Sequence, residues 1–340
     1  MSKVLVTGAN GYIAQYVINE FLTKGYQVIG TVRSAIKGEE LEKKFQNDNF
    51  QTEVIKSLTN YEEISSVLIK HQDLKIFIHT ASSSNLFTQK SEEDILIPNI
   101  ESTKLILKSL KENSPNLEKF IYTSSLSSFN TSVFGPDYID EKTWSNITYD
   151  QGKLNGFYGY AASKKYSELA IIEFFQNEEP IHFKYVIIGL SMVLGTPFFN
   201  NDPINNAAKL LLKPLQAESI EHVEPLNYIT VTVEDVAKAH FQSGIDSKIS
   251  NGRLLVTGNR ITHQDVLEVG NTVLGLQNLI PKGEVRKEAI DLNTNVNNDY
   301  TFKLLGFKPE STFKNLQKVI QYLSDKGEFK KNINHLNTES

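Results

Sequence analysis

The chain has 340 residues, 40% of them hydrophobic, and its 35 Lys and Arg against 40 Asp and Glu give a net charge of −5. This length suits about two domains, the hydrophobic share excludes global disorder, and the charge does not favour binding to nucleic acid. The absence of cysteine excludes disulfides, thiolate metal sites and cysteine nucleophiles. With no apolar run near the roughly 20 residues that span a bilayer, and no room for a signal peptide before Val4, we expect a cytoplasmic protein without membrane contact.

The first two-thirds of the sequence alternate between short apolar runs and longer amphipathic stretches, which is typical of strands and helices in turn. The predicted strands are Val4–Val6, Tyr26–Val32, Thr52–Ile55, Lys75–His79, Lys119–Thr123 and Phe183–Ile188. The predicted helices are Tyr12 to about Thr23, Ile36–Phe45, Tyr61–Lys70, Asp94–Leu110 and Tyr160–Phe175. Strands that alternate with helices of this length pair in parallel, so we expect an α/β fold with a doubly wound parallel sheet.

The last third is less regular. It is predicted to contain a loop over Pro197–Pro203, a strand over Tyr228–Val233, a helix from Glu234 and an apolar run over Arg253–Val256. After Thr262, which suits a helix N-cap, two or three helices run to about Leu323. We expect a nucleotide-binding domain of residues 1–190 plus about 229–260, a smaller cap of about 191–228 plus 261–325, and a polar tail over 326–340.

A glycine turn joins the first predicted strand to the first predicted helix. Gly8 and Gly11 are three residues apart, and Ala14 follows where a third glycine often allows close contact between helix and sheet. Glycine lets backbone N–H groups approach a pyrophosphate at the positive end of the helix. An ordinary strand–helix turn is the alternative, but the position after the first strand favours a dinucleotide site.

The residue that ends the second predicted strand usually distinguishes NAD from NADP. An acidic side chain there would hold the adenosine ribose, whereas this chain has Arg33, with Lys37 one helical turn further on. A guanidinium can bind a 2′-phosphate through two hydrogen bonds. The alternative is a pair of solvated charges at the start of a helix, but we favour NADP(H) over NAD.

A tyrosine with a lysine four residues later is a candidate proton-relay pair, because the two side chains share one face of a helix. The ammonium can then lower the pKa of the phenol from about 10 toward neutrality. The chain contains four such pairs, Tyr138/Lys142, Tyr149/Lys153, Tyr160/Lys164 and Tyr322/Lys326. Spacing alone does not choose among them.

Sequence context favours Tyr160 and Lys164. Tyr138 follows a turn signature, and Tyr149 precedes a glycine that suits a helix interior poorly. Tyr322 lies near the C-terminal end of the chain, far in sequence from the glycine turn. Tyr160 opens a good helix, and Ser125 precedes it at the end of the strand Lys119–Thr123. Ligands of such sheets bind beyond the carboxyl ends of the strands, so the Ser125 hydroxyl and the Tyr160 phenol can meet over one substrate.

These residues resemble the extended short-chain dehydrogenases/reductases. More narrowly, they are similar to the fungal NADPH-dependent aldehyde and ketone reductases of the methylglyoxal/isovaleraldehyde group, which are relatives of plant dihydroflavonol reductases. The resemblance covers nearly the whole chain, through Thr7–Ala14, Thr31–Ser34, His79–Ser82, Thr123–Ser125, Tyr160–Lys164, Asp235–His240 and Lys303–Phe307. It implies a Rossmann-type fold with a smaller C-terminal substrate-binding cap.

The resemblance also implies residue roles. Ser125 would hold a carbonyl oxygen, Tyr160 would donate a proton, and Lys164 would bind the nicotinamide ribose and tune Tyr160. The implied cofactor-binding residues are Gly8, Asn10, Gly11, Tyr12, Ile13, Arg33, Lys37, Ser57, Leu58, Thr80, Ala81, Tyr160, Lys164, Ser191 and Met192. His79 is expected to pack within its strand rather than relay protons, and no metal is expected.

Three positions depart from the family's pattern. Ser57 stands where an Asp near the adenine is usual, and Ser83 stands where a proline is expected. Gly189-Leu190 replaces a frequent Asn-Pro. These positions concern the packing of adenine and nicotinamide rather than the three catalytic candidates.

We therefore expect an NADP-dependent oxidoreductase of the EC 1.1.1 type that reduces a small aldehyde or ketone to an alcohol, as a monomer or homodimer. An apolar substrate pocket could be lined by Phe87, Phe129, Phe134, Phe198 and Phe199, although each could equally belong to the core. One alternative is an NAD-dependent nucleotide-sugar epimerase or dehydratase, which Arg33 disfavours. Another is a catalytically silent NADP-sensing protein, which the complete set of Ser125, Tyr160 and Lys164 disfavours.

Overall fold

The computed structural model describes residues 2–130, 138–224, 226–273, 275–276, 279–283 and 295–329. The chain forms two units. The first consists of Met1–Leu190, Ala237–Val256 and Thr294–Phe307, and the second of Ser191–Val236, Thr257–Asn293 and Lys308–Ser340. These limits differ from the predicted domains at three places, because residues 229–236 and 257–260 fall in the second unit and residues 295–307 in the first.

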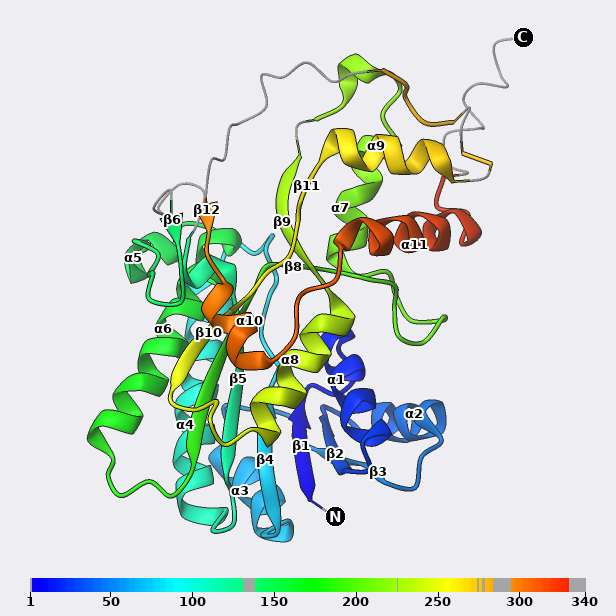
Figure 1. Cartoon of the computed structure of the whole chain (residues 1–340). Coiled ribbons are helices and arrows are strands. Elements are labelled where there is room, and N and C mark those ends of the chain that lie inside the picture. The colour runs from blue at the N-terminus through cyan, green and yellow to red at the C-terminus, as the bar shows by residue number, and fades with distance from the viewer. Residues whose placement is uncertain are drawn as a thin grey trace. The chain divides into compact units, whose positions relative to one another are not determined.

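A parallel sheet of seven strands lies at the centre of the first unit, in the order β10-β7-β5-β4-β1-β2-β3 (Figure 1). Its strands are β1 (Lys3–Thr7), β2 (Gln27–Val32), β3 (Phe50–Val54), β4 (Leu74–His79), β5 (Lys119–Ser125), β7 (Lys184–Leu190) and β10 (Gly252–Val256). The strand order reverses at β1, which is the topology of the doubly wound Rossmann-type fold. The predicted fold class is confirmed.

Helices cover both faces of this sheet (Figure 1). They are α1 (Tyr12–Thr23), α2 (Ala35–Phe45), α3 (Tyr61–Lys70), α4 (Ile97–Asn113), α6 (Gly156–Asn177) and α8 (Val233–Ile245). On one face, α3, α4 and α6 bury Ile64, Ile106 and Ile171 in a single core with the strands. On the other face, Phe21 of α1 meets Phe241 of α8, with the ring centroids 5.1 Å apart.

Local caps and short turns explain where the structure departs from the predicted elements. Helix α6 begins at Gly156 rather than at Tyr160, because the Asn155 side chain accepts a hydrogen bond from the Tyr158 N–H and so caps the helix earlier. The predicted helix Asp94–Leu110 divides into a π-helical turn and α4. Several elements too short for a periodic pattern went unpredicted, among them α5 (Tyr149–Gly152), β6 (Tyr138–Ile139), β12 (Asn295–Val296) and a 3-10 turn over Leu126–Ser128. The helix Asn206–Leu215 also went unpredicted, although it is ten residues long.

The second unit has a core of its own. In it, β9 (Asn227–Thr232) pairs in parallel with β8 (Met192–Leu194) and antiparallel with β11 (Arg260–Thr262). The helices α7 (Asn206–Leu215), α9 (His263–Thr272) and α11 (Thr312–Asp325) supply most of the core. Thr262 caps α9 as predicted, because its side chain accepts a hydrogen bond from the Asp265 N–H. A further helix, α10 (Asp299–Leu305), belongs to the first unit.

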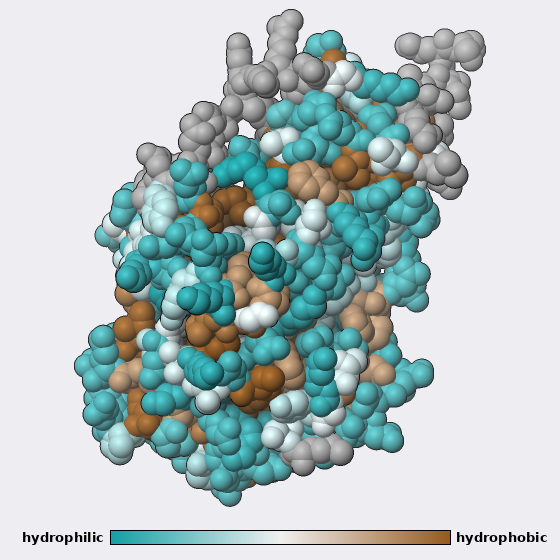
Figure 2. Space-filling view, in the orientation of Figure 1, coloured by the Kyte–Doolittle hydropathy of each residue, from teal (hydrophilic) through white to brown (hydrophobic). Residues whose placement is uncertain are grey.

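The surface in view is mostly hydrophilic, with apolar residues in separate groups (Figure 2). Within the described residues, no helix combines the length and the hydrophobicity that crossing a membrane requires.

Gly189 of β7 packs directly against the ring of Phe129. A Cβ at position 189 would lie 2.2 Å from Cε2 of Phe129, and Phe129 is fully buried. The guanidinium carbon of Arg253 lies 3.7 Å from the centroid of the same ring, so the ring has little space to move aside. The glycine at this position is therefore required by packing. Phe129 belongs to a buried cluster with Ile139 and Leu255, and its place at a substrate pocket stays a prediction.

We predict that Gly189→Ala lowers the free energy of unfolding by about 1–3 kcal/mol, because the added methyl overpacks the Phe129 site. Gly252→Ala is the matched control, since a Cβ there would meet its nearest atom, the Ser250 oxygen, at 3.9 Å. The control should change stability by less than about 0.5 kcal/mol. Urea denaturation measures both, and equal effects would contradict the prediction.

Candidate active site

The carboxyl ends of three neighbouring strands bring most of the predicted residues together. In the sheet, β1 lies beside β4 and β4 beside β5, with Thr7 opposite His79 and His79 opposite Tyr122. The glycine turn follows β1, Thr80 and Ala81 follow β4, and Ser125 ends β5. These segments therefore share one edge of the sheet, where ligands of doubly wound folds bind.

Thr7 ties the glycine turn to the segment after β4. Its Oγ1 accepts hydrogen bonds from the N–H groups of Thr80 and Ala81, both at 3.1 Å. The Thr7 hydroxyl can itself donate its hydrogen to Nδ1 of His79 at 2.8 Å. Gly8 has φ +66°, and a Cβ there would lie 3.0 Å from Cβ of Ala81, so both backbone conformation and close approach call for glycine.

The N-terminus of α1 has the properties of an anion site. Gly11 is the N-cap residue, no side-chain hydrogen bond within the described chain caps the helix, and the first turn has no acidic residue. Asn10 and Gly11 are exposed, while Tyr12 and Ile13 are half-buried. The first N–H groups of the helix and its dipole therefore remain available to a negatively charged ligand.

Two exposed cations follow β2. Arg33 comes directly after the strand, and Lys37 lies in the first turn of α2. Neither side chain has an ion pair or hydrogen bond to another residue in the described part of the chain. The first turn of α2 also has no acidic residue. A phosphate could bind here without displacing an existing partner.

The remaining predicted cofactor residues lie in two places. Ser57 is exposed in the loop after β3, where its N–H donates to Glu63 at 3.2 Å, and Leu58 packs on the core of the first unit. Ser191 and Met192 belong to the second unit. Ser191 is buried, and its hydroxyl has no hydrogen-bond partner among the described residues.

Ser125, Tyr160 and Lys164 converge within the first unit. Ser125 ends β5, and its side chain lies close enough to the phenol of Tyr160 on α6 to influence the pKa of that phenol. The Ser125 hydroxyl donates to Oγ of Ser127 at 3.1 Å. The Nζ of Lys164 lies 5.7 Å from the centroid of the Tyr160 ring and donates to the backbone oxygen of Thr123 at 2.9 Å. A hydroxyl, a phenol and an ammonium thus meet at the end of one strand, as expected from the sequence context.

The pKa of Tyr160 moves in the direction opposite to the expected one. Burial raises it, and the Ser125 side chain only opposes this rise. The Lys164 ammonium is directed at the Thr123 oxygen, and burial lowers the pKa of Lys164 itself to about 8 while the Glu168 charge opposes that fall. The phenol is therefore protonated at neutral pH, which is the form that can donate a proton.

The other tyrosine–lysine pairs have different surroundings. Lys153, beside Tyr149, is exposed and forms ion pairs with Glu92 at 3.3 Å and Asp150 at 3.2 Å. Tyr138 lies half-exposed in β6, and Tyr322 lies in the second unit. Among these four tyrosines, Tyr160 is the one whose pKa is affected by the Ser125 side chain within the described residues.

Asn99 is a buried residue of the site region that sequence reasoning missed. Its Oδ1 accepts from the Ser83 N–H at 2.7 Å, and its Nδ2 donates to the Ser83 oxygen at 2.9 Å and to Ser163 Oγ at 3.0 Å. A proline at position 83 has no N–H and could not form the first of these bonds. A single asparagine in a helix gives no sequence signal for such a role.

The aromatic residues predicted to line a substrate pocket are divided between the two units. Phe87 is 92% exposed, and Phe134 lies outside the described residues. Phe198 and Phe199 contact each other in the second unit, with centroids 4.8 Å apart.

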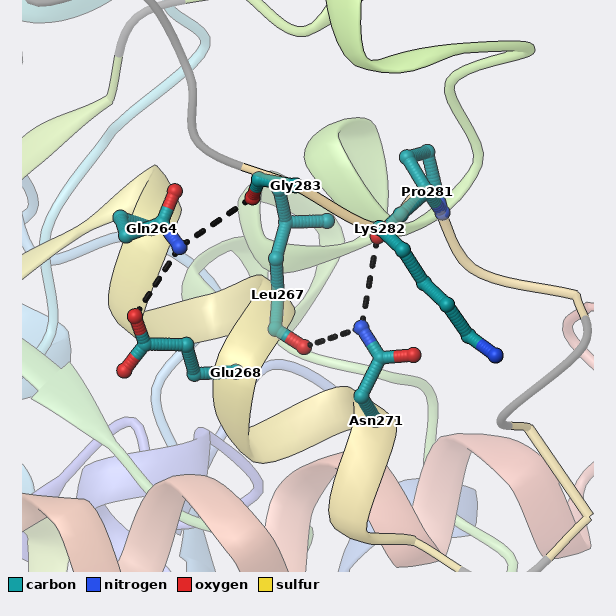
Figure 3. Close-up of a pocket in the computed structure, with 7 residues that line it drawn as sticks. All are labelled: Gln264, Leu267, Glu268, Asn271, Pro281, Lys282 and Gly283. Carbon is teal, nitrogen blue, oxygen red and sulfur yellow. Dashed lines mark hydrogen bonds between the residues drawn. The ribbon is translucent and has the colours of Figure 1, made fainter.

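A cavity of about 400 Å³ in the second unit contains none of the predicted site residues (Figure 3). Its lining residues are Gln264, Leu267, Glu268, Asn271, Pro281, Lys282 and Gly283. The amide of Gln264 donates to Glu268 at 2.9 Å and to the Gly283 oxygen at 3.4 Å, so it holds the chain against α9. Within the described residues, no group of three or more His, Asp or Glu side chains could hold a metal ion.

We predict that His79 makes stability depend on pH. Burial, and then the Lys164 charge, lowers the pKa of His79 from 6.5 to about 3, so below pH 6.5 the unfolded chain takes up a proton that the folded protein does not. Stability is lost as the pH falls from about 6.5 toward 3, by up to about 1.4 kcal/mol per pH unit. Urea unfolding across this range should show a steeper loss for the wild type than for His79→Gln. The same substitution at the exposed His182 should keep the wild-type slope. Equal slopes for wild type and His79→Gln would refute the prediction.

Comparison with known proteins gives the chain its family. Residues 4–243 match the NAD dependent epimerase/dehydratase family. The chain is 32% identical to the NADPH-dependent methylglyoxal reductase GRE2 of Saccharomyces cerevisiae, over 94% of this chain and 96% of that protein. It is also 32% identical to the putative uncharacterized oxidoreductase YDR541C of the same yeast, over 90% and 93% of the two chains.

A solved structure agrees with these matches. The crystal structure of Gre2 from Candida albicans in complex with NADPH superposes with a TM-score of 0.90 at 28% identity, over 96% of this chain and 99% of that one. The chain therefore belongs to the NAD dependent epimerase/dehydratase family, and its resemblance to extended short-chain dehydrogenases/reductases is confirmed.

Proposed function

We propose that the chain is an NADPH-dependent reductase that converts an aldehyde or ketone carbonyl to an alcohol. The placement of Ser125 at the end of β5 beside Tyr160 and Lys164 on α6, with Lys164 bonded to the Thr123 oxygen of the same strand, is the observation that carries this proposal. The name of a relative, NADPH-dependent methylglyoxal reductase, supports the reaction class and the cofactor. The cytoplasmic location and the monomeric or homodimeric state stay predictions from the sequence.

The residues present fit NADP(H). The open N-terminus of α1 beyond Gly8 and Gly11 suits a pyrophosphate, because its N–H groups and dipole favour negative charge. Arg33 and Lys37 suit a 2′-phosphate, since both are exposed cations without a partner in the described chain. Thr80 and Ala81 would lie beside the nicotinamide ribose, and Lys164 would donate to that ribose.

The reaction assigns one task to each catalytic residue. NADPH supplies a hydride when it is bound. Ser125 would donate a hydrogen bond to the carbonyl oxygen of the substrate and so orient it next to the phenol. Tyr160 would give its proton to the oxygen as negative charge develops there, and burial keeps the phenol protonated until that step. The positive charge of Lys164 would stabilise the tyrosinate that remains.

Two alternatives are weaker. A nucleotide-sugar epimerase that uses NAD would favour an acidic residue at the end of β2, where this chain has Arg33. A silent NADP-sensing protein would not need Ser125, Tyr160 and Lys164 to converge. Oxidation of NADPH in the presence of a panel of small aldehydes and ketones, followed by absorbance, separates the three functions.

We predict that Tyr160→Phe lowers kcat by about 10²–10⁴-fold, because it removes the proton donor and leaves the ring in place. NADPH binding, measured by fluorescence titration, should survive. Tyr149→Phe is the matched control, because it removes the same hydroxyl from another tyrosine–lysine pair and should keep wild-type turnover. Turnover retained by Tyr160→Phe would refute Tyr160 as the acid.

We predict that Arg33→Asp shifts the cofactor preference from NADPH toward NADH, because a carboxylate repels the 2′-phosphate and accepts hydrogen bonds from a free ribose. The ratio of kcat/KM for the two cofactors measures the shift. Lys43→Asp makes the same charge change in the last turn of α2 and should leave the ratio unchanged. An unchanged preference in Arg33→Asp would discard the role of Arg33.

A further inference from the structure

A buried ion pair lies beside the three catalytic candidates. The carboxylate of Glu168 is fully buried, and its Oε2 accepts a hydrogen bond from Nε of Arg253 at 2.7 Å. The guanidinium of Arg253 lies between the rings of Phe129 and Trp144, at 3.7 and 3.8 Å from their centroids. Its Nη1 also donates to the backbone oxygens of Glu141 and Thr143, at 3.1 and 2.6 Å. Burying two charges is costly, so each charge depends on the other for compensation.

The second carboxylate oxygen of Glu168 holds the segment that carries Ser125. Its Oε1 accepts hydrogen bonds from the hydroxyls of Ser124 and Ser128, which stand on either side of Ser125. The Ser128 hydroxyl also lies 2.8 Å from the backbone oxygen of Ser125, and Oγ of Ser125 accepts from the Ser127 N–H at 3.2 Å. The end of β5 and the 3-10 turn after it are thus fixed by one buried charge.

Glu168 also shares a helix face with the other two catalytic candidates. Tyr160, Lys164 and Glu168 follow at intervals of four residues on α6, so their side chains point to the same side. The ionisable groups that face Lys164 are Tyr160 and Glu168 on its own helix, Tyr122 on β5 with its ring centroid at 5.1 Å, and His79 on β4. Among these, the carboxylate is the group that favours the charged form of Lys164.

We infer that Glu168 is a positioning residue of the active site, which holds Ser125 in place through its two flanking serines and supports the charge of Lys164, while Arg253 holds Glu168. Glu168 would touch neither substrate nor cofactor. The inference rests on the proposed function for its effect on turnover, but the structural role of Glu168 toward Ser125 and Lys164 is independent of the reaction. Sequence reasoning missed this residue, although its spacing of four from Lys164 was a usable signal.

The test is Glu168→Gln, which keeps the shape of the side chain and removes its charge. We expect kcat for a reducible carbonyl to fall by about tenfold or more, because the single amide oxygen of glutamine cannot accept from both Arg253 and the two serines that flank Ser125. KM and the NADPH dissociation constant should change by less than about twofold. Loss of the carboxylate also removes support for the Lys164 ammonium. The titration midpoint of Lys164, followed by NMR of ¹³C-labelled lysine and assigned with Lys164→Arg, should therefore move to lower pH, together with the alkaline limb of kcat.

Two further variants keep the test decisive. Glu42→Gln is the matched control, because Oε1 of Glu42 likewise accepts from a hydroxyl and an N–H, both of Thr52, at 2.8 and 2.6 Å in the same unit. It should retain wild-type kcat and Lys164 midpoint. If Glu168→Gln alone fails to fold, Glu168→Leu/Arg253→Met removes both charges together with the acceptor oxygens and leaves no unpaired buried ion. This double variant should fold but keep the lowered kcat and the lowered midpoint.

The outcomes separate the two proposals. A folded Glu168→Gln or double variant with kcat within about twofold of the wild type overturns the positioning role, as does an unchanged Lys164 midpoint. If the wild type reduces no carbonyl, the proposed function fails, and the Lys164 midpoint then decides the role of Glu168 by itself.

Discussion

The parallel alignment of β1, β4 and β5 is the constraint on which the candidate site depends. Three adjacent strands end at one edge of the sheet, so the segments that follow them meet there although they are far apart in sequence. Thr7 completes this arrangement, since one hydroxyl serves two backbone N–H groups after β4 and the ring of His79. The glycine turn, the segment of Thr80 and Ala81, and Ser125 therefore share a rigid base.

The same edge contains charges that the fold keeps away from water. Lys164, Glu168 and Arg253 are all buried, and they face one another or backbone oxygens rather than solvent. Such groups are expensive to bury, and each must be compensated by a specific partner. The cost fixes side-chain positions more tightly than apolar packing would, because a small displacement exposes an uncompensated charge.

Much of this molecule could be predicted from sequence, and the rest depends on contacts that leave no periodic signal. Strand–helix alternation located the doubly wound sheet, and local context selected Tyr160 among four equivalent spacings. The direction of the Tyr160 pKa could not be predicted, because it depends on how deeply the phenol is buried. The hydrogen bonds between Asn99 and Ser83 and the packing of Phe129 on Gly189 join segments that are distant in sequence, so they are seen only in the folded chain.

Trp144 has an uncommon consequence for how this protein could be observed. It is the only tryptophan in the chain, and its indole ring stacks on the guanidinium that anchors Glu168. All tryptophan fluorescence of the polypeptide therefore originates next to that ion pair. The fluorescence of Trp144 can therefore report on the ion pair between Glu168 and Arg253 without a dye or an engineered label.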